Sequence, residues 1–242
     1  MTRKIHDTDY LFLTTRVRAL EGCLLNRGQM EQMLEAGSPE EAARILTDCG
    51  YPELETVSAI TVGEMLTRER ERLFQDLAEL VPDPAILAVF QLPHDYHNVK
   101  VLLKSEAMGI QEDRLLVDAG RIPSKQLVAA LRSGEVQNLP PQLGEAIDEA
   151  RQVLSATRDP QLGDMVLDRR YFQELLVLAE ETGSLFLQGY VQRMIDAANL
   201  RTVVRVLRMG QGTEFLEGIL FPGGNMEVER LLTGINGGSM LE

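Results

Sequence analysis

The 242-residue sequence has no tryptophan, few aromatic residues (5%) and only two cysteines, Cys23 and Cys49. Two cysteines this far apart match neither a disulfide framework nor a cysteine-rich metal site. We therefore expect a reducing, cytoplasmic setting in which both cysteines are buried in the core. The amino terminus lacks the apolar stretch of a signal peptide. The longest apolar run, residues 175–179, is far shorter than the ~20 residues of a membrane helix.

Positive charge is scarce, because 24 lysines and arginines stand against 37 aspartates and glutamates, which gives a net charge of −13. Such a surface repels phosphate backbones and anionic lipid head groups. The charge balance therefore argues against a nucleic-acid binder and against an electrostatic membrane binder. It suits basic protein partners, although an acidic surface also serves solubility alone.

Strand patterns are nearly absent, because no run of β-branched or aromatic residues alternates between turn residues. Leucine, alanine, methionine and glutamate, which favour helices, are abundant instead. Helices are expected to begin near Ser38, Thr61 and Asp83, and the last of these should stop or kink at Pro93. The sequence therefore predicts an all-α fold.

A candidate boundary lies at residues 134–141, where glycine and two prolines occur. Divided there, the chain has its first helical unit or units at residues 1–134 and a second at residues 135–242. The same segment equally fits a helix-to-helix loop within one continuous domain.

An internal repeat relates residues 95–104 to residues 196–205, at an offset of 101 positions. Both segments follow the pattern D-x-x-N-[VL]-[KR]-x-[LV]-[LV]-[KR]. Downstream, Ile122-Pro123 resembles Phe221-Pro222 after a small change of register. A weaker third copy begins near residue 15. The pattern predicts pseudo-repeated helical units, two clear copies and a partial third, rather than a solenoid of short repeats.

Helical spacing places Asp95, Asn98, Asp196 and Asn199 on the apolar stripe of their helices. Aspartate and asparagine are mediocre helix formers, so their recurrence at a buried edge indicates bonding partners on a neighbouring element. We predict a structural role in packing between units, in which each aspartate pairs with an arginine or backbone group of the adjacent copy. For Asp95, a simpler alternative is that it caps a helix after Pro93.

Motifs for catalysis and cofactor binding are missing. The sequence has no phosphate-binding loop, no dinucleotide fingerprint and no His-Glu-x-x-His motif. His94 and His97 could face one metal ion, but no further ligand lies near them in sequence. Tyr171 and Phe172 are expected in the core. We predict no catalytic residue, no cofactor and no metal.

Four stretches together resemble the C subunit of the archaeal/vacuolar-type (A/V-type) ATP synthases and ATPases. They are residues 16–25, the first Asp-x-x-Asn segment, residues 167–172 and the second Asp-x-x-Asn segment. The resemblance implies a funnel-like array of helical units that acts as a non-catalytic central-stalk subunit. Its implied partners are the central shaft subunits and the membrane proteolipid ring, between which it transmits torque for proton or sodium transport.

The resemblance also implies a location on the inner face of the membrane, held there by protein partners and not by direct insertion. Members of the family usually continue into a further helical segment, so the chain is expected to be a fragment or a shortened variant. No motif indicates proton or sodium specificity, or the direction of the reaction.

Two other readings remain open from the sequence. One is a free-standing helical adaptor built on the same repeat, and the other is an enzyme that uses a carboxylate cluster within the helical bundle. Four basic residues lie off the apolar stripe and are candidates for partner contact, or else form an ordinary solvated face: Lys100, Lys104, Arg201 and Arg205.

Overall fold

The computed structural model describes residues 6–110, 113–210, 212–216 and 218–236. Throughout these ranges the regular secondary structure is helical and no strand occurs, which confirms the all-α prediction. No helix within them has the length and apolar character needed to cross a bilayer.

The chain divides into two compact units, Met1–Leu87 and Ala88–Glu242. The candidate boundary at residues 134–141 lies inside the second unit. There the short 3-10 helix η3 (Val136–Asn138) contacts both the helix before it and the helix after it.

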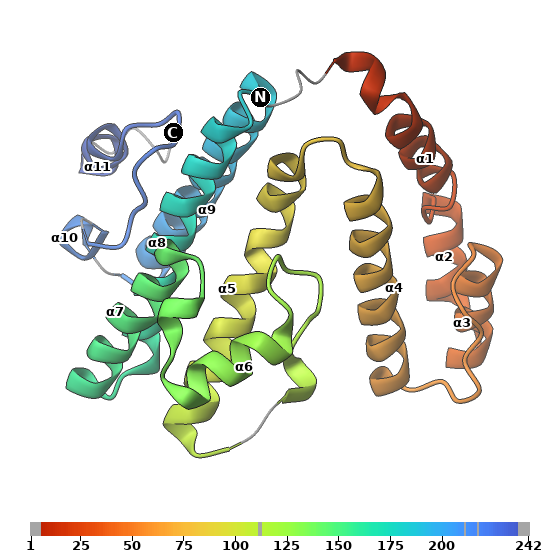
Figure 1. The fold of residues 1–242 in the computed structure, drawn as a ribbon, viewed down its shortest axis with the longest axis horizontal. Helices are drawn as coiled ribbons and strands as arrows, with labels where there is room; N and C mark the ends of the chain where they lie inside the picture. Colours follow the sequence, from red (N-terminus) through yellow and green to blue (C-terminus); the bar gives the residue numbers. More distant parts are fainter. Residues whose placement is uncertain (1–5, 111–112, 211, 217, 237–242) are drawn as a thin grey trace. The chain divides into compact units, whose positions relative to one another are not determined.

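The first unit consists of a 3-10 turn and four α-helices, in which α1 lies beside α4 and α2 packs on α3 (Figure 1). Its helices are η1 (Asp7–Tyr10), α1 (Leu11–Glu21), α2 (Arg27–Glu35), α3 (Pro39–Asp48) and α4 (Ala59–Leu80). Ser38 caps α3 as predicted by accepting from the backbone N–H of Glu41. Helix α4 begins earlier than predicted, because Ser58 and Thr61 form a reciprocal cap that places Thr61 inside the helix.

The core of the first unit is small. Its buried apolar side chains include Leu46, Cys49 and Met65, whereas many large apolar side chains on α1, α2 and α4 are exposed. Cys23 is exposed, so the prediction that both cysteines are buried is wrong for this residue. Cys23 lies just after α1, two residues beyond the last helical residue, Glu21.

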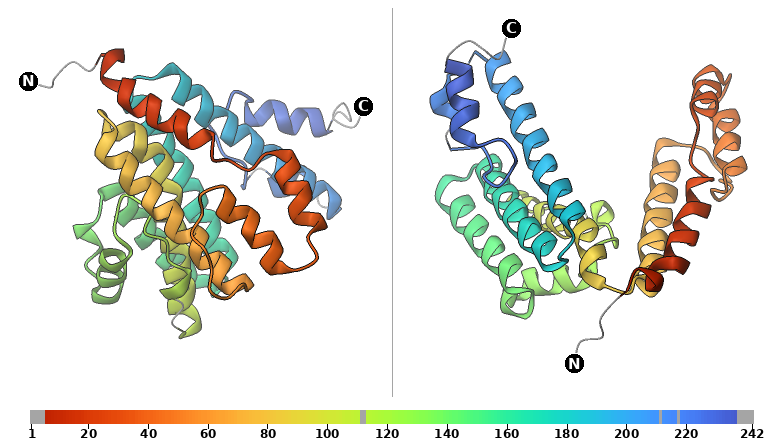
Figure 2. Two further views of the ribbon diagram at one scale, coloured as in Figure 1. Left: turned by 90° about the vertical axis from the view of Figure 1, so that its right-hand side faces the viewer. Right: turned by 90° about the horizontal axis from the view of Figure 1, so that it is seen from above.

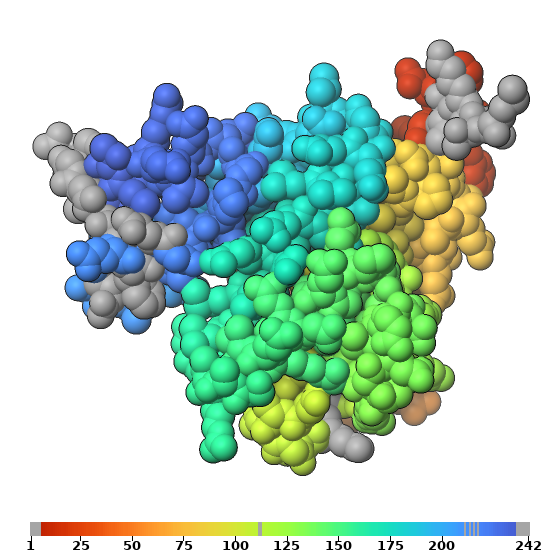
Figure 3. Space-filling model, turned by 60° about the vertical axis from the view of Figure 1, so that its left-hand side comes forward, coloured from red at the N-terminus to blue at the C-terminus, as the bar shows by residue number. Residues whose placement is uncertain are grey.

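The second unit is built on longer helices, and α7, α8 and α9 follow one another as antiparallel neighbours (Figure 2). In the space-filling view, the teal region of α8 lies between the green region of α6 and α7 and the blue region toward the C-terminus (Figure 3). Its remaining elements are α5 (Pro84–Met108), η2 (Asp113–Leu115), α6 (Ser124–Ser133), α7 (Pro141–Thr157), α8 (Pro160–Glu181), α9 (Leu185–Arg208), α10 (Thr213–Leu216) and α11 (Val228–Asn236).

Helix α5 is continuous through Pro93, so of the predicted stop or kink at that residue the stop does not occur. A proline inside a helix removes one backbone hydrogen bond and crowds the preceding turn. Burial on both sides offsets this cost, because Leu92, Tyr96 and Val99 are almost completely inaccessible to solvent. Tertiary packing therefore decides the course of the chain here.

One large hydrophobic core joins α5, α6, α7, α8 and α9. A smaller cluster, which includes Val203, Val206 and Leu216, lies between α9 and α10. Helices α5 and α9, which carry the Asp-x-x-Asn segments, are both anchored by this burial, so the polar side chains of those segments are held in fixed positions.

Candidate functional site

Each asparagine of the repeat ties its helix to a segment that follows it in sequence. Asn98 Nδ2 donates to the carbonyl of Val117 at 2.8 Å, and Val117 N–H donates back to Asn98 Oδ1 at 2.9 Å. Asn199 makes the same two bonds with Phe221, both at 2.8 Å. Both asparagines are fully buried. A side-chain amide can pair in this way with one N–H and one C=O, so neither backbone group is left unsatisfied.

Each aspartate binds the same following segment, a few residues further on. Asp95 accepts from Ile122 N–H at 3.2 Å and from Arg121 Nε at 2.7 Å. Asp196 accepts from Met226 N–H at 3.0 Å and from the backbone and side-chain nitrogens of Asn225 at 3.2 and 3.1 Å. We call each set of bonds, from one helix to its following segment, a joint.

A glycine completes each joint. A Cβ atom added to Gly120 would overlap Oδ1 of Asp95, and one added to Gly224 would overlap Oδ1 of Asp196. The carboxylate thus occupies the space that a side chain on the loop would need. Only a residue without a Cβ allows the loop backbone to approach this closely.

The contacts set the register of the two joints. Phe221, Gly224 and Met226 each lie 104 positions after their counterparts, Val117, Gly120 and Ile122. The helices are 101 positions apart, so the second connecting segment is three residues longer. The alignment of Ile122-Pro123 with Phe221-Pro222 is therefore wrong, because a match of residue types could not locate that insertion.

The first joint extends to α8 through Arg121. Its Nη2 donates to Glu174 Oε1 at 2.7 Å, and Tyr96 OH donates to Glu174 Oε2 at 2.9 Å. Asp95 and Glu174 are 0% and 2% exposed. Burial raises the pKa of Asp95, and the hydrogen bond and charge of Arg121 oppose that rise. Burial and the neighbouring Glu174 raise the pKa of Tyr96 well above its ordinary value.

The direct partners of both aspartates belong to the segment after their own helix, and not to the other copy. Arg121 and Tyr96 make the contact with α8 for the first joint. At the second joint Asn225 replaces the arginine, so Asp196 is held by neutral donors among the described residues.

Glu174 was not predicted as part of this site. The only signal in the sequence is its position on the apolar stripe of α8, seven residues after Leu167 and next to Leu175, which are both buried. A carboxylate on such a stripe needs a buried partner.

Aromatic rings connect the two joints across α8. The ring of Tyr96 lies 5.6 Å from that of Tyr171, Tyr171 lies 4.9 Å from Phe172, and Phe172 lies 4.7 Å from Phe221. Tyr96 binds Glu174 in the extension of the first joint, and the backbone of Phe221 pairs with Asn199 in the second joint. Tyr171 and Phe172 pack against the core, partly buried, as its outer members.

The four basic candidates are in two different situations. Lys100 and Lys104 form ion pairs with Asp168 and Asp164 on α8, at 2.5 and 2.6 Å. The remaining two are on α9 and exposed, where Arg201 Nε donates to the carbonyl of its own helix at Ala197.

The buried carboxylates of the first joint are both held by bonding partners. Asp95 and Glu174 share one guanidinium, and neither lines the larger described cavities. His97 bonds to the carbonyl of Leu115 through Nε2. Within the described ranges, no three histidine, cysteine, aspartate or glutamate side chains converge as metal ligands. What the geometry does provide is a fixed connection between helices.

Comparison with known proteins finds one family along most of the chain. The family described as "ATP synthase (C/AC39) subunit" matches residues 13–240. The chain is 26% identical over 230 residues to the C subunit of the V-type sodium ATPase of Enterococcus hirae, a match that spans 95% of this chain and 70% of that protein. It is 27% identical over 230 residues to the C subunit of the V-type ATP synthase of Thermus thermophilus, with 92% and 70% coverage.

A more distant relative is the C subunit of the A-type ATP synthase of Methanocaldococcus jannaschii. It is 23% identical over 225 residues, and the match spans 86% of this chain and 56% of that protein. Since the family match extends over nearly the whole sequence, the chain belongs to the ATP synthase (C/AC39) subunit family.

Proposed function

We propose that this protein is a non-catalytic central-stalk subunit of a rotary A/V-type ATP synthase or ATPase. In this role it links the shaft subunits to the membrane proteolipid ring and transmits torque for proton or sodium transport. The observation that carries the proposal is the family match over residues 13–240, together with relatives that are all named as the C subunit of such complexes.

The contacts of the second unit are compatible with a mechanical role. A part that passes torque must resist sliding of one helix past another. Three side chains on α5, namely Tyr96, Lys100 and Lys104, bind carboxylates on α8, and the two joints fix α5 and α9 to their following segments. Buried, fully bonded polar groups of this kind favour one arrangement over others.

The proposed location is the cytoplasmic face of the membrane, reached through protein partners. No described helix is suited to span a bilayer, and the net charge of −13 opposes direct adsorption to anionic lipid. The proteolipid ring and the shaft would then provide the attachment.

The proposal is tested by reconstituting the rotary complex with and without this chain. With the chain, ATP hydrolysis should drive ion uptake into proteoliposomes, assayed separately with protons and with sodium. Without it, the head should still hydrolyse ATP while ion uptake is lost. Ion uptake of equal size without the chain, or failure of the chain to co-purify with shaft and ring proteins, would refute the proposal and favour a free-standing adaptor.

A further inference from the structure

Helix α5 meets α8 through a row of polar contacts, which we call the polar ladder. Its side chains at steps of four, Tyr96, Lys100 and Lys104, bind Glu174, Asp168 and Asp164 in that order. Numbers rise along α5 while they fall along α8, so the two helices run antiparallel at this contact. The two lysines therefore bind carboxylates that stand four positions apart on one helix face.

Helix α9 repeats the basic half of this ladder. Arg201 and Arg205 stand 101 positions after Lys100 and Lys104. They occupy the same two basic positions of the repeat pattern. Both arginines are exposed, and no described acidic side chain forms an ion pair with either of them. Asp164 and Asp168 border the same cavity of about 490 Å³ as these arginines, but they are paired with the lysines of α5.

Apolar side chains surround the two arginines. Leu200, Val204 and Met209 are 39%, 48% and 64% exposed. Together with the arginines they border an open hollow of about 510 Å³. Its lining among the described residues comes from α9 and its C-cap: Leu200, Arg201, Val204, Arg205, Arg208 and Met209. On the opposite side of this helical segment, Val203 and Val206 are buried in the smaller hydrophobic cluster between α9 and α10. We call these six residues the α9 face.

We propose that the α9 face is a docking site for an amphipathic helix of a partner protein, one that carries two carboxylates four residues apart beside apolar side chains. The partner helix should run antiparallel to α9, as α8 does to α5. The inference stands on the repeat and on the charges of α9, and it does not depend on the rotary role proposed above.

The features of the α9 face favour a helix over other occupants. A free inorganic anion would bind the arginines but would leave the exposed leucine, valine and methionine uncovered. A second copy of this chain is disfavoured because the carboxylates of its α8 are already paired and because copies of charge −13 repel each other. A complementary acidic helix satisfies both the charges and the apolar area.

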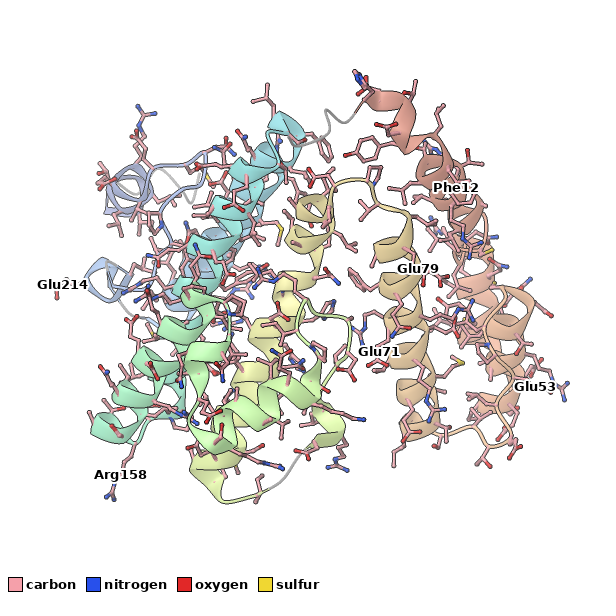
Figure 4. All side chains as sticks on the ribbon, viewed as in Figure 1. Phe12, Glu53, Glu71, Glu79, Arg158 and Glu214 are labelled. Carbon is pink, nitrogen blue, oxygen red and sulfur yellow. The ribbon has the colours of Figure 1, made fainter. Side chains whose placement is uncertain are left out.

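The test uses the full chain and a helix-stapled synthetic peptide with the sequence of residues 160–181, labelled for fluorescence anisotropy. We expect binding that weakens with added salt and that falls about tenfold or more for Arg201→Glu/Arg205→Glu. The matched control is Arg44→Glu/Arg158→Glu, which changes net charge equally at exposed positions. Arg158 projects away from the end of α7 (Figure 4), and the control should bind like the unaltered chain.

A charge swap makes the test specific. A peptide with Asp164→Lys/Asp168→Lys should bind the Arg201→Glu/Arg205→Glu chain and not the unaltered chain. Circular dichroism checks that each variant is folded. The proposal is overturned if the unaltered peptide does not bind or if charge reversal on α9 leaves binding unchanged. It is likewise overturned if the charge-swapped peptide does not bind the Arg201→Glu/Arg205→Glu chain. It is also overturned if sedimentation shows self-association that the α9 reversal abolishes, because the occupant is then a second copy.

Discussion

The Nη2 atom of Arg121 lies 2.7 Å from Oε1 of Glu174, and this bond joins the segment after α5 to the middle of α8. The same guanidinium holds Asp95 through Nε. One positive charge thus serves two carboxylates that solvent barely reaches. Such an arrangement is stable only while all its members are present, since a lone buried charge is strongly unfavourable.

Replacing Arg121 should therefore destabilise the second unit. Arg121→Met should lower its free energy of unfolding by about 3–5 kcal/mol, because two buried carboxylates lose their counter-charge. The loss should shrink as pH falls. In the unaltered chain Arg121 opposes the rise that burial causes in the pKa of Asp95. Without Arg121 this pKa rises further, so acid protonates Asp95 and removes the unpaired buried charge. Urea unfolding at several pH values measures both effects.

Two further variants check the cause of that loss. Adding Asp95→Asn and Glu174→Gln to Arg121→Met should recover part of the stability, since the unpaired charges are gone. Arg158→Met, at an exposed position, should change stability little. A loss for Arg121→Met below about 1 kcal/mol would contradict a shared, buried charge network.

The two asparagines should be equally important. Asn98→Ala and Asn199→Ala each leave one N–H and one C=O of the following segment without their partner, at Val117 and at Phe221. We expect a loss of about 2–4 kcal/mol for each, since a buried unpaired backbone group costs about 1–3 kcal/mol. Thermal or urea unfolding of both variants gives the comparison. A large effect at one position only would show that the joints differ in structure.

Gly120 should not tolerate even a methyl group. Gly120→Ala places a Cβ against the buried carboxylate of Asp95, so the loop or the ion pair must shift, at an expected cost of about 1–3 kcal/mol. The control is Gly63→Ala, an exposed position inside α4 with open space around it. That substitution should stabilise the first unit by about 0.5–1 kcal/mol, as alanine does in a helix. Equal effects would argue against the close approach.

Alkaline solution should unfold the second unit steeply. Burial raises the pKa of Tyr96 and of Tyr171 above the ordinary value of 10.0. The folded state then keeps protons that the unfolded state releases, so stability is intact below pH 10 and falls as pH rises further. Each tyrosine contributes a slope of about 1.4 kcal/mol per pH unit. Tyr96→Phe should halve the combined slope, measured by urea unfolding at a series of pH values. An unchanged slope would mean that Tyr96 ionises freely.

Local sequence patterns predicted much of the fold, for reasons that the structure makes clear. The Ser38 cap and the absence of strand patterns depend on neighbouring residues, which a sequence displays directly. The course of α5 through Pro93 cannot be predicted from neighbouring residues, because it depends on the burial of Leu92, Tyr96 and Val99 among helices that are distant in sequence. The start of α4 was misplaced since two overlapping caps, at Ser58 and Thr61, compete in sequence and only one forms.

The candidate site was predicted in part. Helical spacing correctly indicated that Asp95, Asn98 and Asn199 lie on buried faces. It could not say which segment supplies their partners, because those partners lie 19–30 residues away across a connection whose length differs between the copies. The same periodicity placed Leu200 and Val204 on a buried stripe, whereas both are exposed on the α9 face.

The contact between each aspartate and its glycine has a consequence for recognising related repeats. Because the carboxylate fills the space of the missing Cβ, the two residues constrain each other and should vary together. A compact search pattern follows, in which Asp-x-x-Asn on a helix is paired with a glycine 25 residues after the aspartate in the first copy and 28 in the second. Such a two-part signature can identify this joint in sequences too divergent for alignment along their full length.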